Sequence, residues 1–201
     1  MTTRRPYHHG NLRRVLLQAS IRLIAQVGPD AFTLREVARM AGVSHNAPYR
    51  HFRDKESLLA AVAAQGFTQL ARSLQEHAGR HRGALARFRA AGEGYVEFAL
   101  RWPQHFAVMF DAPPPQGNHP ESIAAASQAF GALLGHIVEC QQERSLPAGD
   151  PRRLALAAWS LVHGIAKLAG AARLGMNSKA EVMRFARFAI DASLRGLASS
   201  R

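Results

Sequence analysis

Apolar residues recur at intervals of three and four along most of this 201-residue chain, and that spacing limits its fold more than any other feature. It is the spacing of one face of an α-helix, whereas a half-buried β-strand requires alternation. Alternation is not sustained here, β-branched residues are sparse, and Ala is abundant. Short segments rich in Gly and Pro separate the apolar stretches. We therefore predict an all-α protein of about nine helices.

The charge of the chain is strongly positive and unevenly distributed. Lys and Arg number 26 against 14 Asp and Glu, which gives a formal net charge of +12, and 47% of residues are hydrophobic. That hydrophobic fraction supports a packed core and excludes a wholly disordered basic tail. The first 60 residues contain ten basic and four acidic side chains, so they carry half of the net charge. This excess predicts an anionic partner, and nucleic acid is the first candidate.

The basic N-terminal region contains the pattern of two short helices joined by a glycine turn. Thr33 and Glu36 have the spacing of a capping box, in which the two side chains satisfy amides at the start of a helix. Ala38 is small enough for helices to approach closely, Gly42 tolerates a turn, and Val43 is apolar and fills the joint. This combination predicts a helix-turn-helix motif.

The second helix of the motif is predicted over residues 44–52, and its outer face carries groups that suit duplex DNA. The candidate DNA contacts of the whole motif are Thr33, Arg35, Ser44, His45, Asn46, Tyr49, His51 and Lys55. His and Asn side chains can reach base edges, whereas Tyr, His and Lys side chains can also meet sugar and phosphate. Each has a structural alternative: Tyr49 as a core aromatic, for example, and Thr33 as a cap only.

Pro48 stands in the first turn of this second helix and lacks an amide proton. The hydrogen bond to the carbonyl of Ser44 is therefore lost if Ser44 is the helix cap. Alternatively, the helix begins at Pro48 itself, because Pro is well suited to the first helical position.

Residues 33–59 resemble the DNA-binding domain of TetR-family transcriptional regulators. The matching elements are Ala41-Gly42-Val43-Ser44, Tyr49-Arg50-His51-Phe52 and Lys55-Glu56-Ser57-Leu58-Leu59. The resemblance implies a three-helix DNA-binding domain over residues 10–70, with its helix-turn-helix motif at 33–52. It also implies a C-terminal ligand-binding and dimerisation domain over residues 71–201. The candidate contacts fall where such proteins touch DNA.

The same resemblance implies the partners and the mode of action. They are a homodimer of this chain, a pseudo-palindromic double-stranded DNA operator and a small effector, with no membrane. The expected function is that of a repressor, released from its operator when the effector binds. Such a protein would act in the bacterial cytoplasm, in association with the nucleoid.

A smaller resemblance lies at residues 158–168, on a helix predicted over 151–174. The Trp159…His163-Gly164 element there is similar to that of the WHG-domain subgroup of TetR regulators. A pocket for a largely apolar effector would have the walls Phe98, Trp102, Phe106, Met109, Phe110, Phe130, Leu133, Leu134, Trp159 and His163. The alternative is that these aromatic residues form an ordinary core, and that His163 is a satisfied core histidine.

The resemblance places the dimer surface on the last two helices, predicted over 151–174 and 178–197. The apolar residues that recur along them are Leu154, Leu161, Ile165 and Leu168 on the first, and Val182, Phe185, Phe188, Ala189 and Ala192 on the second. Two helices from each subunit would form a four-helix interface. The alternative is that both helices pack only within their own chain.

Other classes of function have little support in the sequence. No Gly-x-Ser-x-Gly, Walker or Gly-x-Gly-x-x-Gly motif is present, so we expect no enzyme and no cofactor. His77 and His81 have helical spacing but no nearby third ligand, so we expect no metal site. Cys140 is the single cysteine, and a buried small residue is a better interpretation than a redox sensor.

We also expect a cytoplasmic protein that does not span a membrane. A single cysteine cannot form an internal disulfide, which fits a reducing compartment. No uninterrupted run of 18 apolar residues occurs, and the first residues lack the apolar stretch of a secretory signal. Two alternatives to a repressor remain. One is a nonspecific nucleoid-associated DNA-binding protein, and the other is a helical ligand-binding protein or enzyme with a vestigial DNA-binding domain.

Overall fold

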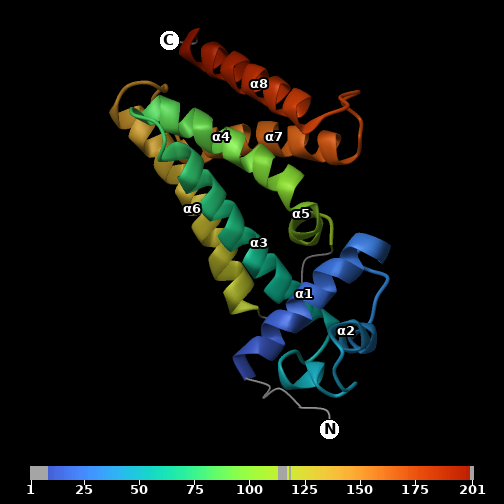
Figure 1. Ribbon diagram of the computed structural model, residues 1–201. Coiled ribbons are helices and arrows are strands. Elements are labelled where there is room, and N and C mark those ends of the chain that lie inside the picture. The colour runs from blue at the N-terminus through green and yellow to red at the C-terminus, as the bar shows by residue number, and fades with distance from the viewer. Residues whose placement is uncertain (1–8, 113–116, 118, 200–201) are drawn as a thin grey trace. The chain divides into compact units, whose positions relative to one another are not determined.

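The computed structural model of the chain describes residues 9–112, 117 and 119–199, and all regular structure within them is helical (Figure 1). The described residues form eight α-helices and one 3-10 turn. The α-helices are α1 (His9–Val27), α2 (Leu34–Ala41), α3 (Lys55–Ala78), α4 (Ala84–Arg101), α5 (Pro103–Phe110), α6 (Pro120–Gln142), α7 (Pro151–Gly170) and α8 (Lys179–Ser199). The 3-10 turn, η1, covers Pro48–Arg50. The predicted all-α class is confirmed.

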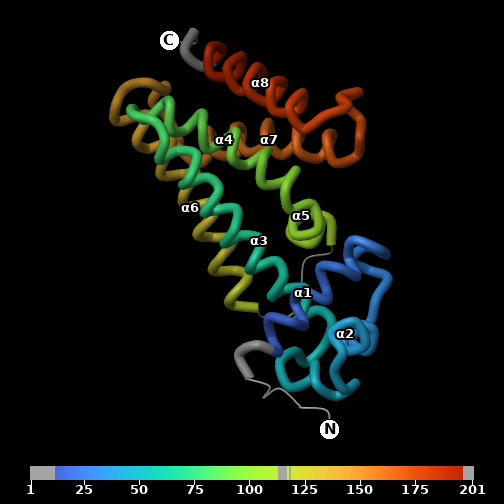
Figure 2. Tube along the Cα trace, in the orientation of Figure 1, coloured from blue at the N-terminus to red at the C-terminus, as the bar shows by residue number. Residues whose placement is uncertain are grey.

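The chain folds as two compact units, which can be followed by residue number in Figure 2. The first unit consists of residues 1–66 together with 104–123, and the second consists of residues 67–103 and 124–201. Residues 104–123 therefore fold with the N-terminal region, although the sequence places them in the C-terminal domain. One reason is close packing of α5 on α3, where a side chain at Gly66 would collide with Met109.

In the first unit, α1 packs against α2, and α2 packs against η1. Leu16 and Leu17 of α1 and Val37 of α2 are almost completely buried. Ser20 is also buried, and its hydroxyl donates a hydrogen bond of 2.8 Å to the carbonyl of Leu16. A buried hydroxyl paired in this way carries little desolvation penalty.

In the second unit, α4 packs against both α7 and α8, which also contact each other. Phe98 of α4 is 1% exposed and lies in the core of this unit. A separate apolar cluster consists of Ala84, Phe88, Ile137, Cys140, Leu146 and Ala155. Cys140 is fully buried there, and burial raises the pKa of its thiol. The interpretation of this cysteine as a buried small residue is confirmed.

Local sequence explains where several helices begin and end. The side chain of Asp150 accepts a hydrogen bond from the amide of Arg152 and so caps α7, with Pro151 at the first helical position. Gly28 follows α1 with a φ of +80°, a conformation that glycine adopts without strain. Helix α7 ends at Gly170 rather than at 174 as predicted, because the chain turns at Ala172, whose φ is +53°.

Among the described helices, α6 alone has the length and apolar composition that crossing a membrane requires, and 22% of its apolar stretch is buried within the structure. Core helices of proteins in water meet the same criterion of length and composition. The expectation that the chain does not span a membrane stays a prediction.

Candidate DNA interface and effector residues

Helix α2 is fixed at both ends by contacts that its sequence predicts. The hydroxyl of Thr33 accepts a hydrogen bond from the amide of Glu36, and the carboxylate of Glu36 accepts one of 2.8 Å from the amide of Thr33. The capping box is therefore confirmed. The hydrogen bonds from Thr33 lower the pKa of Glu36. Gly42 ends the helix in the left-handed conformation, and its amide donates to carbonyls of the last turn.

Residues 44–52, here called the recognition turn, do not form the α-helix that the sequence predicts. Only Pro48–Arg50 are helical, as one 3-10 turn, with Pro48 at the first helical position. The carbonyl of Ser44 instead accepts a hydrogen bond of 2.9 Å from the amide of Ala47. The helical start delayed to Pro48 is thus confirmed, because proline offers no amide to continue a helix from Ser44.

The predicted DNA contacts lie at the surface of the first unit. The exposed residues are Thr33, Arg35, Ser44, His45, Asn46 and Tyr49, whereas His51 and Lys55 are half-buried. Tyr49 is 52% exposed, so the alternative of a core aromatic is wrong. Pro48, in contrast, is completely buried and anchors the turn. Arg50 is also exposed, beside Tyr49 and within the matching Tyr49–Phe52 element, although it is not among the predicted contacts.

Lys55 connects two parts of the first unit. Its ammonium group donates a hydrogen bond of 2.6 Å to the carbonyl of Asp30, in the loop between α1 and α2. The same nitrogen lies 4.6 Å from the centroid of the Phe32 ring. Lys55 therefore has a structural contact as well as its predicted one with phosphate.

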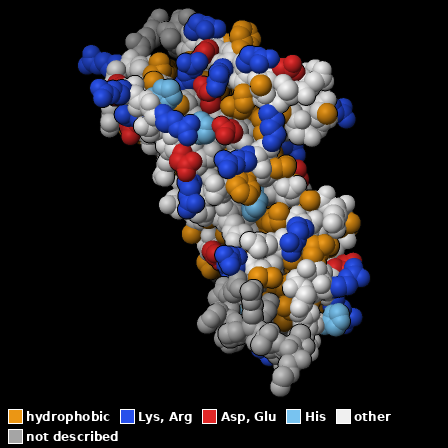
Figure 3. All heavy atoms as spheres, in the orientation of Figure 1, with side chains coloured by type: hydrophobic (Ala, Val, Ile, Leu, Met, Phe, Trp, Pro, Cys, Tyr) orange, Lys and Arg blue, Asp and Glu red, His pale blue; other side chains and the backbone are white. Residues whose placement is uncertain are grey.

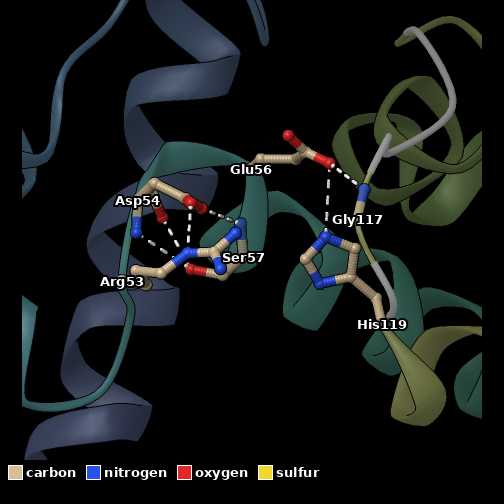
Figure 4. Close-up of polar contacts among 6 residues, drawn as sticks. All are labelled: Arg53, Asp54, Glu56, Ser57, Gly117 and His119. Atoms are coloured by element: carbon tan, nitrogen blue, oxygen red, sulfur yellow. Dashed lines mark hydrogen bonds and ion pairs between the residues drawn. The ribbon is translucent and has the colours of Figure 1, made fainter.

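The start of α3 carries a cap of its own, drawn in Figure 4. The carboxylate of Asp54 accepts a hydrogen bond of 2.7 Å from the amide of Ser57, and the amide of Asp54 donates one of 3.2 Å to the Ser57 hydroxyl. Arg53 lies 2.9 Å from the same carboxylate. The backbone amide of Ser57 and the guanidinium of Arg53 lower the pKa of Asp54. The recognition turn is thus bracketed by two capped helices, α2 and α3.

In the second unit, Trp159 and His163, two of the predicted effector residues, both contact Tyr95, which is not among the predicted ones. The indole nitrogen of Trp159 donates to the hydroxyl oxygen of Tyr95 at 3.1 Å, and that oxygen lies 2.8 Å from Nδ1 of His163. The indole of Trp159 can only donate, whereas the tautomer of the His163 ring decides which of Tyr95 and His163 donates to the other. Burial raises the pKa of Tyr95. The periodicity of α4 could not indicate this role of Tyr95, because its partners Trp159 and His163 lie on α7.

The other predicted effector residues fall into separate groups. Phe130, Leu133 and Leu134 pack against the apolar cluster of the second unit. Phe106 and Phe110 lie on α5 of the first unit, with ring centroids 4.9 Å apart. Met109 packs at Gly66, as described above. Phe98 is buried, and Trp102 lies next to Arg101, whose guanidinium is 5.7 Å from its ring centroid. The effector pocket stays a prediction.

Ion pairs connect α4 to α8 in the second unit. Arg89 lies 2.7 Å from Asp191, and Arg187 lies 2.7 Å from Glu93. Figure 3 shows basic side chains spread over the visible face of the molecule with acidic ones between them. Part of the positive charge outside the first unit is therefore engaged in contacts within the chain.

Comparison with known families identifies the chain. Residues 16–62 match the family described as bacterial regulatory proteins, tetR family, and residues 88–193 match the tetracyclin repressor-like C-terminal domain. The chain belongs to the TetR family. The resemblance seen at residues 33–59 is thereby confirmed, whereas the WHG subgroup stays a prediction.

Individual relatives agree with this membership. The HTH-type transcriptional repressor Rv3405c of Mycobacterium tuberculosis is 33% identical over 110 residues, which are 50% of this chain and 58% of the relative. A solved structure from Rhodococcus sp. RHA1, described as a protein with unknown function, is 37% identical with a TM-score of 0.83, and the match covers 97% of this chain and 100% of the other.

A more distant structure shares the fold. AibR, solved in complex with isovaleryl coenzyme A and operator DNA, is 19% identical with a TM-score of 0.63, and the match covers 78% of this chain and 86% of AibR. The chain spans less than two thirds of the length of the first curated relatives that it matches.

Proposed function

We propose that this TetR-family protein is a transcriptional repressor that binds an operator in duplex DNA through its recognition turn. The observation that carries the proposal is the exposure of Ser44, His45, Asn46 and Tyr49 on a turn bracketed by two capped helices. Exposed polar side chains at such a position suit base edges, whereas the net charge of +12 supplies attraction to phosphates. Thr33, Arg35, His51 and Lys55 are proposed to contact the backbone or neighbouring bases.

The decisive test is footprinting of the purified protein on the DNA that flanks its own gene. We expect one protected palindrome at moderate salt. Equal protection of random duplex would instead support a nonspecific nucleoid protein. Absence of any binding would support a ligand-binding protein with a vestigial DNA-binding domain.

Variants connect the footprint to the recognition turn. Arg35→Ala removes an exposed charge on α2 and is expected to abolish the specific footprint while leaving the protein folded. Arg72→Ala removes the same charge from an exposed position on α3 and serves as the control. If Arg35→Ala and Tyr49→Ala both keep the operator affinity of the unchanged protein, the proposed contacts are wrong.

The proposed repressor acts as a homodimer, with an interface formed by α7 and α8. Leu168 and Phe188 are 46% and 63% exposed, as an interface between subunits requires. Ile165 and Val182, which the sequence also predicted there, are buried within their own chain instead. Phe188→Glu is expected to give monomers in sedimentation velocity, whereas Ile123→Glu, at a position 57% exposed on α6, is expected not to. Unchanged dimers with Phe188→Glu would refute this interface.

The proposed repressor is released by a small, largely apolar effector that binds in the second unit. The half-buried rings of Trp159 and His163 lie beside the hydroxyl of the buried Tyr95, and such a site for an apolar ligand combines aromatic surface with a polar group. AibR was solved with isovaleryl coenzyme A and operator DNA, so a first screen compares small apolar compounds with acyl thioesters of coenzyme A, which count as polar because of their phosphates. A true effector raises the melting temperature of the protein and weakens operator binding. The proposal of an apolar effector fails if only polar metabolites have both effects.

A further inference from the structure

Two polar bridges join the elements around the recognition turn to Gly117 and His119, which precede α6, and to Glu121 in its first turn. In the first, Oε1 of Glu56 accepts a hydrogen bond of 2.8 Å from the amide of Gly117 and lies 3.3 Å from Nε2 of His119 (Figure 4). In the second, the guanidinium of Arg13 lies 2.8 Å from the carboxylate of Glu121. All of these residues belong to the first unit.

The second bridge reaches the recognition turn itself. The guanidinium carbon of Arg13 lies 5.8 Å from the ring centroid of Phe52, the last residue of that turn. Phe52 is 3% exposed, so its ring anchors the turn in the core of the first unit. Arg13 therefore contacts both the anchor of the turn and the first helical turn of α6.

In the first bridge, the backbone at Gly117 lies close to the side chain of His119. A side chain at Gly117 would place its Cβ 3.0 Å from Nε2 of His119. Glu56 lies in the first turn of α3, directly after Lys55, and the side chain of His119 is 13% exposed. This contact holds Gly117 and His119 against the start of α3, next to Lys55, the last of the predicted DNA contacts along the chain.

The recognition turn has little rigidity of its own. Its only helical part is the three-residue 3-10 turn Pro48–Arg50. So short a helical segment is unstable in isolation, so its orientation depends on the residues that anchor it.

From these contacts we propose that Arg13 and Glu56 are positioning residues, which hold the recognition turn in the orientation that binds the operator by connecting it to Gly117, His119 and Glu121. The inference rests on the proposed repressor function. Positioning and electrostatics predict opposite changes in operator affinity when an acidic side chain of a bridge is neutralised. Glu56 and Glu121 are negative charges in a unit that binds a polyanion, so electrostatics alone predicts tighter DNA binding when either charge is removed. Positioning predicts weaker binding.

Glu121→Gln is the sharpest variant, because the side chain of Glu121 is 64% exposed and its loss leaves the core intact. We expect operator affinity, measured by fluorescence anisotropy at fixed salt, to fall about threefold, as for the loss of an exposed ion pair. Asp30→Asn is the matched control, since it removes an exposed charge from the same unit without touching either bridge. It is expected to leave affinity unchanged or to raise it slightly.

A charge exchange separates positioning from a general structural role. Arg13→Glu alone is expected to weaken operator binding, and the double variant Arg13→Glu with Glu121→Arg is expected to recover part of the loss. Glu56→Ala is expected to weaken binding, whereas Glu56→Gln, which keeps an oxygen for the Gly117 amide, is expected to weaken it less. Lost folding stability alone would give no recovery in the double variant, and because that variant also restores the net charge, the Glu121→Gln result decides whether charge alone explains the recovery.

Hydrogen exchange of the free protein tests the positioning without DNA. Amides of residues 44–52 are expected to exchange about threefold faster in Glu121→Gln and Glu56→Ala than in the unchanged chain. The inference is overturned if exchange there is unchanged, or if Glu121→Gln tightens operator binding as charge removal alone predicts. If the unchanged protein binds no operator, the proposed function fails. The exchange rates of residues 44–52 in the two variants then still show whether the bridges order the turn.

Discussion

Polar side chains in and beside the recognition turn are mostly exposed or bonded to backbone groups, whereas in the second unit several bond to one another between helices. Thr33 and Asp54 cap α2 and α3, and the recognition turn between them exposes its polar side chains. Tyr95 and His163 instead bond each other between α4 and α7. The difference indicates that the recognition turn keeps its polar groups exposed, while the second unit uses several polar groups to connect its helices.

The largest effect is expected from a change in the core of the second unit. Phe98→Ala removes a ring that is 1% exposed and leaves a cavity, so the free energy of unfolding should fall by about 3–5 kcal/mol. Thermal or urea denaturation measures this loss. A loss below about 1 kcal/mol would show that this core repacks easily, and the contrast between the units would weaken.

Tyr49→Ala tests the other side of the contrast. Its side chain is 52% exposed, so its removal should leave the melting temperature nearly unchanged. Operator affinity should nevertheless fall by about 10-fold to 100-fold, as expected for a loss of about 1–3 kcal/mol of contact energy. Anisotropy titration measures this, and Tyr49→Phe, which keeps the ring, is the control. A large loss of stability would place Tyr49 in the folded core instead.

Tyr95→Phe removes a single oxygen from the polar contacts of the second unit. The indole of Trp159 and Nδ1 of His163 each lose their bond to that oxygen, so we expect a loss of about 1–3 kcal/mol in the free energy of unfolding. Chemical denaturation measures it. An unchanged or higher stability would mean that water or neighbouring groups replace the hydroxyl at no cost.

The smallest effect is expected at the cap of α3. Asp54→Ala should cost about 1 kcal/mol, as is typical for a lost N-terminal cap. The pKa of Asp54 is lowered in the folded protein, so its contribution is present above the unfolded pKa of about 3.9 and is lost as pH falls through the folded value. The stability difference between Asp54→Ala and the unchanged protein should therefore shrink in acid. A difference independent of pH below 5 would contradict this assignment.

The helix-turn-helix region could be predicted well because its signals are local. The capping box needs only Thr33 and Glu36, three residues apart, and the delayed helical start needs only Pro48. The prediction of an α-helix over residues 44–52 was wrong. The periodicity of apolar residues does not distinguish an α-helix from a bend followed by one 3-10 turn. Predicted contacts such as Tyr49 lie at the surface, yet their role in DNA binding stays a proposal.

The sequence by itself determined the helical class, the caps and the membership in the TetR family, because periodicity and motif spacing act over a few residues. Only the tertiary structure decided that residues 104–123 fold with the N-terminal unit. The same holds for the contact of Tyr95 with His163, 68 positions apart, and of Arg13 with Glu121, 108 positions apart. Such pairs form because packing brings distant helices together, and no local spacing in the chain encodes which polar side chains will then meet.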